Sequence, residues 1–127
     1  MVITGYSNGG IATWYFARLY PEYFAAAIPM AFNDTIVGET PLPIYAIQGE
    51  KDELFSIEDV RQAIGKLKTR GFDVTLHERY RARHMDVCAY HSDLEAAGQW
   101  LQEHAFPKAA RSAAKPPTRS DVTGQQR

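Results

Sequence analysis

Cysteine and long apolar runs are scarce in this sequence. Its 127 residues include one cysteine, Cys88, which excludes an intramolecular disulfide and a cysteine-rich zinc site. We expect Cys88 to be a small residue of the core. No apolar run approaches the ~20 residues of a membrane-spanning helix, and no basic and apolar leader precedes residue 7. We therefore expect no membrane partner and, for the chain as given, a cytoplasmic location.

The net charge is also small, at −1 with histidine neutral, but it is unevenly distributed. Residues 1–106 carry nine Lys and Arg against fourteen Asp and Glu, whereas residues 107–127 carry five against one. The second segment has one large aliphatic residue, Val122, and cannot bury enough apolar surface to offset the entropy of ordering. We expect one domain over residues 1–106 and a disordered basic tail over residues 107–127. The composition favours a solvated tail over a nucleic-acid-binding one, and no nucleic-acid partner is expected.

Three of the nine glycines lie close together near the start, in the stretch TGYSNGG. Within it, Gly5 to Gly9 fits G-x-S-x-G, the nucleophile elbow, in which a tight strand-to-helix turn holds the serine in a strained conformation. Side chains at Gly5 and Gly9 are expected to collide across such a turn. β-branched residues precede the motif, and a helical pattern follows it as far as Pro21. This context favours Ser7 as a nucleophile with positive φ over the alternative, a structural turn with a capping serine.

The rest of residues 1–106 predicts strands that alternate with helices. Strands are expected over residues 2–4, 24–32, 42–48 and 72–80, and helices over 10–20, 56–70 and 92–106. The later helices open with capping-box spacings, Ser56 to Asp59 and Ser92 to Glu95. The last helix is expected to bury one face, formed by Leu94, Ala97 and Leu101. The pattern predicts an α/β fold with a mostly parallel sheet of about four strands, flanked by helices.

Three chemically useful side chains follow three of these strands. Ser7 ends the first, Asp52 stands three residues after Gly49 at the end of the third, and His84 follows the last. The carboxyl ends of parallel strands meet at one edge of the sheet, and serine, acid and histidine follow each other in the chain order of a hydrolase triad. Glu50, Glu53 and Asp34 are also candidates for the acid, and Asp34, which follows the second strand, is the first alternative. A solvated loop side chain is the simpler alternative for His84.

The other histidines, His77, His91 and His104, fall within a strand, before a helix and near a helix end. The seven-residue spacing of His77, His84 and His91 matches no zinc motif. We expect neither a metal site nor a cofactor.

The sequence resembles the carboxyl-terminal half of an α/β-hydrolase serine esterase. The group is that of the polyhydroxyalkanoate depolymerase-like, feruloyl esterase-like and phospholipase/carboxylesterase-like enzymes. GYSNGG matches the elbow, RLYPEYFAAAIPMAF the segment after it, PIYAIQGEKDELF the acid loop, and ARHMD the turn of the histidine. Gln48 stands where the family often has histidine. The resemblance covers residues 2–106 and implies Ser7 as nucleophile, Asp52 as acid and His84 as base.

Members of this family carry roughly four more strands before the elbow, and the loop after the third supplies one of two oxyanion donors. The backbone N–H of Asn8 is the donor that we expect here. Losing the other costs on the order of 3 kcal/mol. The short loop over residues 33–41 leaves no room for a lid domain, which favours small or accessible esters. The expected acyl pocket, whose members are also candidates for core packing, is formed by Tyr6, Met30, Phe32 and Met85.

Three interpretations stay open at this point. The first is a serine esterase that works through an acyl-enzyme. The second is a non-catalytic, truncated hydrolase fragment that acts, if at all, through association. The third is an acyl-transfer or peptidase variant of the same triad. In each case the strand over residues 2–4 lacks a neighbour on one side, and Trp14, Tyr15 and Phe16 cannot all point inward. We therefore expect at least a homodimer.

Overall fold

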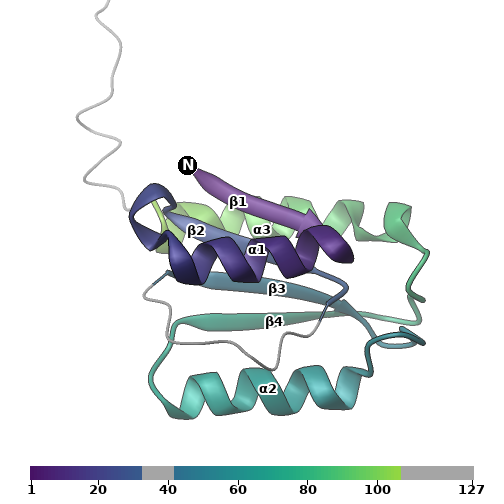
Figure 1. Ribbon diagram of the computed structural model, residues 1–127. Coiled ribbons are helices and arrows are strands. Elements are labelled where there is room, and N and C mark those ends of the chain that lie inside the picture. The colour runs from purple at the N-terminus through teal and green to yellow at the C-terminus, as the bar shows by residue number, and fades with distance from the viewer. Residues whose placement is uncertain (33–41, 107–127) are drawn as a thin grey trace, which may run out of the picture.

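The computed structural model describes residues 1–32 and 42–106, and in them four parallel strands form one sheet. The strands are β1 (Val2–Tyr6), β2 (Ala26–Met30), β3 (Ile44–Gly49) and β4 (Val74–Arg79). They lie side by side in chain order, with Val2 opposite Ala26 and Ile44 opposite Val74 (Figure 1). The prediction of an α/β fold with about four parallel strands is confirmed.

Helices cover both faces of this sheet. They are α1 (Asn8–Leu19), α2 (Ile57–Thr69) and α3 (His91–His104), with short 3₁₀ helices at Pro21–Tyr23 and Val87–Tyr90. Helices α1 and α2 cover one face of the sheet and α3 covers the other (Figure 1). Trp14 of α1 and Ile64 of α2 pack with Ile44 on the first face, and Trp100 of α3 packs with Tyr45 and Ile47 on the second. Every residue of β2 and β3 is buried, which explains why these segments are continuously apolar in the sequence.

The inner face predicted for α3 is confirmed at Ala97, which is buried, and at Leu101, which packs against the core, but it is wrong at Leu94. The buried residues of α3 are Asp93, Ala97 and Trp100, whereas Leu94 is 41% exposed. Asp93 is buried because β4 supplies partners for its carboxylate. Its Oδ1 lies 2.8 Å from His77 Nε2 and 3.7 Å from Arg79 Nη1. The contact with β4 thus places a carboxylate on the inner face of α3, beside the apolar residues Ala97 and Trp100.

Both capping boxes are also wrong. Ser56 is the N-cap residue of α2, but its hydroxyl donates to Glu58 at 2.9 Å and makes no capping bond. Helix α3 begins at His91, one residue before Ser92, and Ser92 Oγ accepts a hydrogen bond from Arg79. Cys88 is exposed rather than part of the core. The partner of Ser56 is thus a neighbouring carboxylate, and that of Ser92 is a residue of β4, so neither hydroxyl makes the bond that the spacing predicted.

The open edge expected at the first strand is present in the described part of the chain. There β1 pairs with β2 alone, at one end of the sheet. Trp14 is buried, but Tyr15 is 48% and Phe16 is 41% exposed, so the three aromatic side chains do not all point inward. The loop over residues 33–41, which contains Asp34, and the tail over residues 107–127 lie outside the described residues. Within residues 1–32 and 42–106, no helix is long and apolar enough to cross a membrane.

Candidate active site

Ser7 occupies a strained turn between β1 and α1. Its backbone has φ 54° and ψ −115°, a region that a non-glycine residue rarely adopts. The Ser7 N–H donates to the Met30 carbonyl at 3.0 Å, and the Ser7 carbonyl accepts from the Gly10 N–H at 2.8 Å. These bonds tie the turn to the end of β2 and to the first turn of α1. The positive φ expected for a nucleophile elbow is confirmed.

The glycines around Ser7 differ in how much space a side chain would have at each position. A Cβ at Gly5 would lie 2.1 Å from the Gly9 carbonyl oxygen, so the strand and the helix can approach only because Gly5 has no side chain. A Cβ at Gly9 would meet nothing within 4 Å, and the collision predicted for that position is wrong. The second close approach is at Gly10, where a Cβ would lie 2.7 Å from the Met30 carbonyl oxygen.

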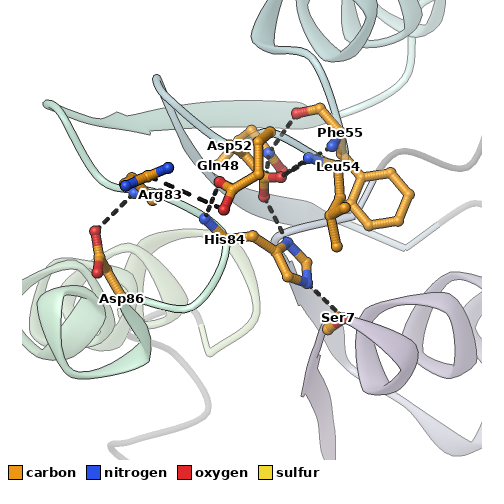
Figure 2. Close-up of polar contacts among 9 residues, drawn as sticks. Ser7, Gln48, Asp52, Leu54, Phe55, Arg83, His84 and Asp86 are labelled. Carbon is orange, nitrogen blue, oxygen red and sulfur yellow. Dashed lines mark hydrogen bonds and ion pairs between the residues drawn. The ribbon is translucent and has the colours of Figure 1, made fainter.

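The structure brings Ser7, His84 and Asp52 into direct contact. Ser7 Oγ lies 2.8 Å from His84 Nε2, and His84 Nδ1 lies 2.9 Å from Asp52 Oδ2 (Figure 2). Asp52 follows β3 and His84 lies in the loop after β4, as the strand-end argument predicted. Asp52 is 7% exposed and His84 3% exposed, so the contact between them is shielded from water. Their catalytic roles stay a prediction at this point.

The Asp52 carboxylate accepts three further hydrogen bonds. Its Oδ1 accepts from the backbone N–H groups of Leu54 and Phe55, each at 2.9 Å. Its Oδ2 accepts from Gln48 Nε2 at 3.0 Å, in addition to the bond with His84 (Figure 2). A carboxylate can accept several hydrogen bonds in this way, and the four together fix the orientation of the group.

The backbone around His84 is anchored to the acid loop. The His84 N–H donates to Glu53 Oε2 at 3.0 Å, and this bond is the main reason that the Glu53 pKa lies below its usual value. The Arg83 N–H donates to Asp86 Oδ2 at 2.8 Å, so Asp86 closes the turn in which His84 lies. Asp52 and Glu53, which are adjacent in sequence, therefore hold the ring and the backbone of the same histidine.

Aromatic rings surround the imidazole. The rings of Phe55 and Tyr6 lie 5.5 Å and 5.7 Å from the His84 ring, and Phe32 lies 4.8 Å from Phe55. Burial, followed by the charge of Asp52, raises the pKa of Tyr6. These rings exclude water from the imidazole on two sides.

The residues predicted for an acyl pocket are divided among three places. Tyr6 and Phe32 lie among the aromatic rings next to His84. Met85, beside His84 in the chain, is 78% exposed. The Met30 side chain is buried in the core with Tyr90 and Trp100, so it is a core residue and does not join the pocket. Its backbone carbonyl, which accepts from Ser7, is the part of Met30 that serves the site.

The remaining histidines have other partners. His77 contacts Asp93, His104 Nδ1 lies 2.9 Å from Asp73, and exposed His91 lies 3.6 Å from Glu95. In residues 1–32 and 42–106, no three His, Cys, Asp or Glu side chains are grouped so as to hold a metal ion.

Sequence reasoning missed the residues that hold the acid and the imidazole in place. The sequence indicates Gln48 only as a departure from the usual histidine, and Glu53 only as an alternative acid. Phe55 had no role. The available signal was their clustering within QGEKDELF, the segment that contains Asp52. A loop that must orient a buried carboxylate needs donors close by, and this loop supplies most of them itself.

Comparison with known proteins identifies related folds and a family. A thermostable esterase of known structure is 29% identical, with a TM-score of 0.67, and the match covers 83% of this chain and 31% of that one. Esterase 2 of Thermogutta terrifontis, solved after phosphorylation by paraoxon, is 21% identical with a TM-score of 0.65, over 84% of this chain and 55% of that one. An uncharacterized secreted protein of Arthroderma benhamiae is 30% identical over 112 residues, which are 84% of this chain and 11% of that protein.

The chain thus spans only part of the length of these relatives, between 11% and 55%. The resemblance to an α/β-hydrolase esterase is confirmed at the level of fold and family, and both support ester hydrolysis in general. The family pattern extends over nearly all of the chain, from residue 1 to residue 113, and on that basis the chain belongs to the dienelactone hydrolase family.

Proposed function

We propose that this chain is a serine-dependent carboxylic ester hydrolase that works through an acyl-enzyme, with Ser7 as nucleophile, His84 as base and Asp52 as the orienting acid. The observation that carries the proposal is the unbroken series of contacts from Ser7 Oγ through the His84 ring to Asp52 Oδ2, at 2.8 Å and 2.9 Å. It starts from a serine with φ 54° at a strand-to-helix turn. A strained serine paired with an oriented base is the arrangement that nucleophilic catalysis requires.

The proposed first step transfers the Ser7 proton. Because Asp52 accepts from Nδ1–H of His84, the unprotonated Nε2 faces Ser7 and accepts its hydroxyl proton as Oγ attacks the ester carbonyl. The imidazolium then donates this proton to the departing alcohol. Water then gives a proton to the same Nε2 and attacks the acyl-enzyme. The carboxylic acid leaves, and His84 returns the proton to Ser7 Oγ.

The oxyanion of the intermediate is proposed to accept from the Asn8 N–H. Asn8 is the first residue of α1, so its N–H has no acceptor inside the helix, and the positive end of the helix dipole is at the same place. Removal of one of two oxyanion donors costs ~10²–10³ in rate, so an activated ester, which needs less stabilisation of the oxyanion, is the best assay substrate.

The surroundings of Ser7 favour a small or accessible acyl group. Tyr6, Phe32 and Phe55 offer aromatic surface beside the imidazole, and exposed Met85 and Leu54 offer apolar surface at its rim. Short apolar acyl chains suit such walls, since they bury some area without requiring an enclosed tunnel.

Covalent labelling tests the nucleophile directly. Paraoxon phosphorylates the related Thermogutta esterase 2, so we expect it to add one diethyl phosphoryl group to this chain, as intact-mass spectrometry would show. Ser7→Ala should abolish the adduct, whereas Ser56→Ala, which changes a serine at the start of α2, should not.

Turnover of p-nitrophenyl acetate completes the test. We expect an initial burst followed by slow steady-state release of p-nitrophenol with the wild type, and only background hydrolysis with Ser7→Ala. Equal rates for the two proteins, together with no paraoxon adduct, would overturn the proposal in favour of a non-catalytic chain.

A further inference from the structure

Gln48 is not one of the three proposed catalytic residues, yet its buried side chain donates hydrogen bonds to Asp52 and to Phe55. It is the second-last residue of β3, is 1% exposed, and carries its carboxamide into the space behind Asp52 (Figure 2). We infer that Gln48 is a positioning residue, which sets the plane of the Asp52 carboxylate and thereby the tautomer of His84. This inference rests on the proposed function.

The two N–H groups of the amide have two separate acceptors. Gln48 Nε2 donates to Asp52 Oδ2 at 3.0 Å and to the Phe55 carbonyl at 3.0 Å. Both partners can only accept, so a flipped amide would place Oε1 against two acceptors. The direction of the Gln48 side chain is therefore determined by its surroundings.

Gln48 connects the carboxylate to the sheet. The donors to Asp52 Oδ1 are the backbone N–H groups of Leu54 and Phe55, which belong to the same loop as Asp52 and move with it. The Gln48 donor comes from β3, where Gln48 lies opposite Glu78 of β4. Because it bonds Oδ2, the oxygen that also accepts from His84, it limits rotation of the carboxylate about its terminal torsion.

The second bond extends the same control to Phe55. By holding the Phe55 carbonyl, Gln48 fixes the residue whose ring lies 5.5 Å from the His84 ring. One amide thus aligns the acid on one side of the imidazole and an aromatic neighbour on another.

Simple packing does not explain a glutamine at this position. Gln48 Oε1 is buried and has no hydrogen-bond partner in the described part of the chain. An unsatisfied buried oxygen reduces stability, and methionine, of nearly the same shape, would fill the space without it. The donors of Gln48 are therefore the property that the site uses.

The first test compares Gln48→Met with Gln62→Met, which makes the same change on the exposed face of α2. With p-nitrophenyl acetate we expect Gln48→Met to lower kcat about tenfold with KM unchanged, since positioning partners act on the chemical step. Gln48→Leu also removes both donors without placing an oxygen against the two acceptors, so it should lower kcat to a similar extent. It replaces Gln48→Met should that variant not fold. Gln62→Met should behave as wild type.

A readout independent of activity separates this inference from the proposed function. Nitrogen-15 chemical shifts of the His84 ring should report the Nδ1–H tautomer in wild type and a mixture of tautomers in the Gln48 variants. If wild type shows no Ser7-dependent turnover, the proposed function fails, and the tautomer comparison still decides the role of Gln48. Unchanged His84 shifts, wild-type kcat, or a rise in KM alone in a folded Gln48 variant would overturn the inference.

Discussion

Replacement of Asp52 by asparagine is expected to lower kcat about 10⁴-fold without unfolding the protein. The loss follows from the orientation that the new carboxamide must adopt. Two backbone N–H groups, from Leu54 and Phe55, point at the Oδ1 position and need an acceptor there. The amide oxygen therefore takes that position, and the NH₂ group takes the place of Oδ2, facing His84 Nδ1.

A donor at that place reverses the tautomer of His84. Its Nδ1 must then be unprotonated, so the ring proton moves to Nε2, which lies 2.8 Å from Ser7 Oγ and can no longer accept the hydroxyl proton. A 10⁴-fold loss corresponds to about 5 kcal/mol in the activation free energy. The new NH₂ group also faces Gln48 Nε2, and relief by a flip of Gln48 would sacrifice its bond to Phe55. We expect this conflict to cost about 1–3 kcal/mol of unfolding free energy.

Burst and steady-state rates with p-nitrophenyl acetate measure the effect. The matched control is Asp59→Asn, which changes an exposed carboxylate in the first turn of α2 and should leave kcat as in wild type. Circular dichroism shows whether each variant is folded. A folded Asp52→Asn protein that keeps more than about a tenth of wild-type kcat would refute the tautomer argument.

Two further predictions concern the elbow and the open edge. Gly5→Ala should lower the free energy of unfolding by about 3 kcal/mol, because its Cβ would lie 2.1 Å from the Gly9 carbonyl oxygen. Gly9→Ala should be neutral or stabilising, since a Cβ there meets nothing within 4 Å. Equal denaturation midpoints for the two variants would contradict this prediction. We also propose that the chain forms at least a dimer through the free edge of β1 and the exposed apolar side chains of α1. Light scattering across a dilution series measures this, and a stable 14.3 kDa monomer at micromolar concentration would exclude it.

The sequence predicted best those elements in which the pattern of apolar residues alone indicates which side chains are buried. Strands β2 and β3 are buried on both faces, so each is a continuous apolar run and could be found without knowing its neighbours. The elbow was equally accessible, since a tight turn restricts residue type locally. Even there the sequence could not say which glycine meets a backbone. A Cβ at Gly5 would meet the Gly9 carbonyl, and one at Gly10 would meet the Met30 carbonyl at the end of β2, whereas one at Gly9 would meet nothing within 4 Å.

The parts that sequence predicted poorly depend on partners far along the chain. The buried face of α3 includes Asp93 because His77 and Arg79 of β4 lie opposite it, and no pattern within α3 contains that information. Within the site, Ser7, Asp52 and His84 follow from strand ends and chain order. The role of Gln48 does not, since it depends on the direction of one amide inside the folded core.

The order of the strands determines when the contact between Ser7 and His84 can form during synthesis. Each strand pairs with the one made before it, so the sheet can grow from β1 to β4 as the chain emerges. Ser7 belongs to the first strand and turn, whereas the imidazole that contacts it follows the last strand. Ser7 Oγ therefore has no contact with His84 until β4 has joined the sheet. If Ser7 is the nucleophile proposed above, a labelling reagent specific for that serine would count only the chains in which β4 has paired, rather than all chains.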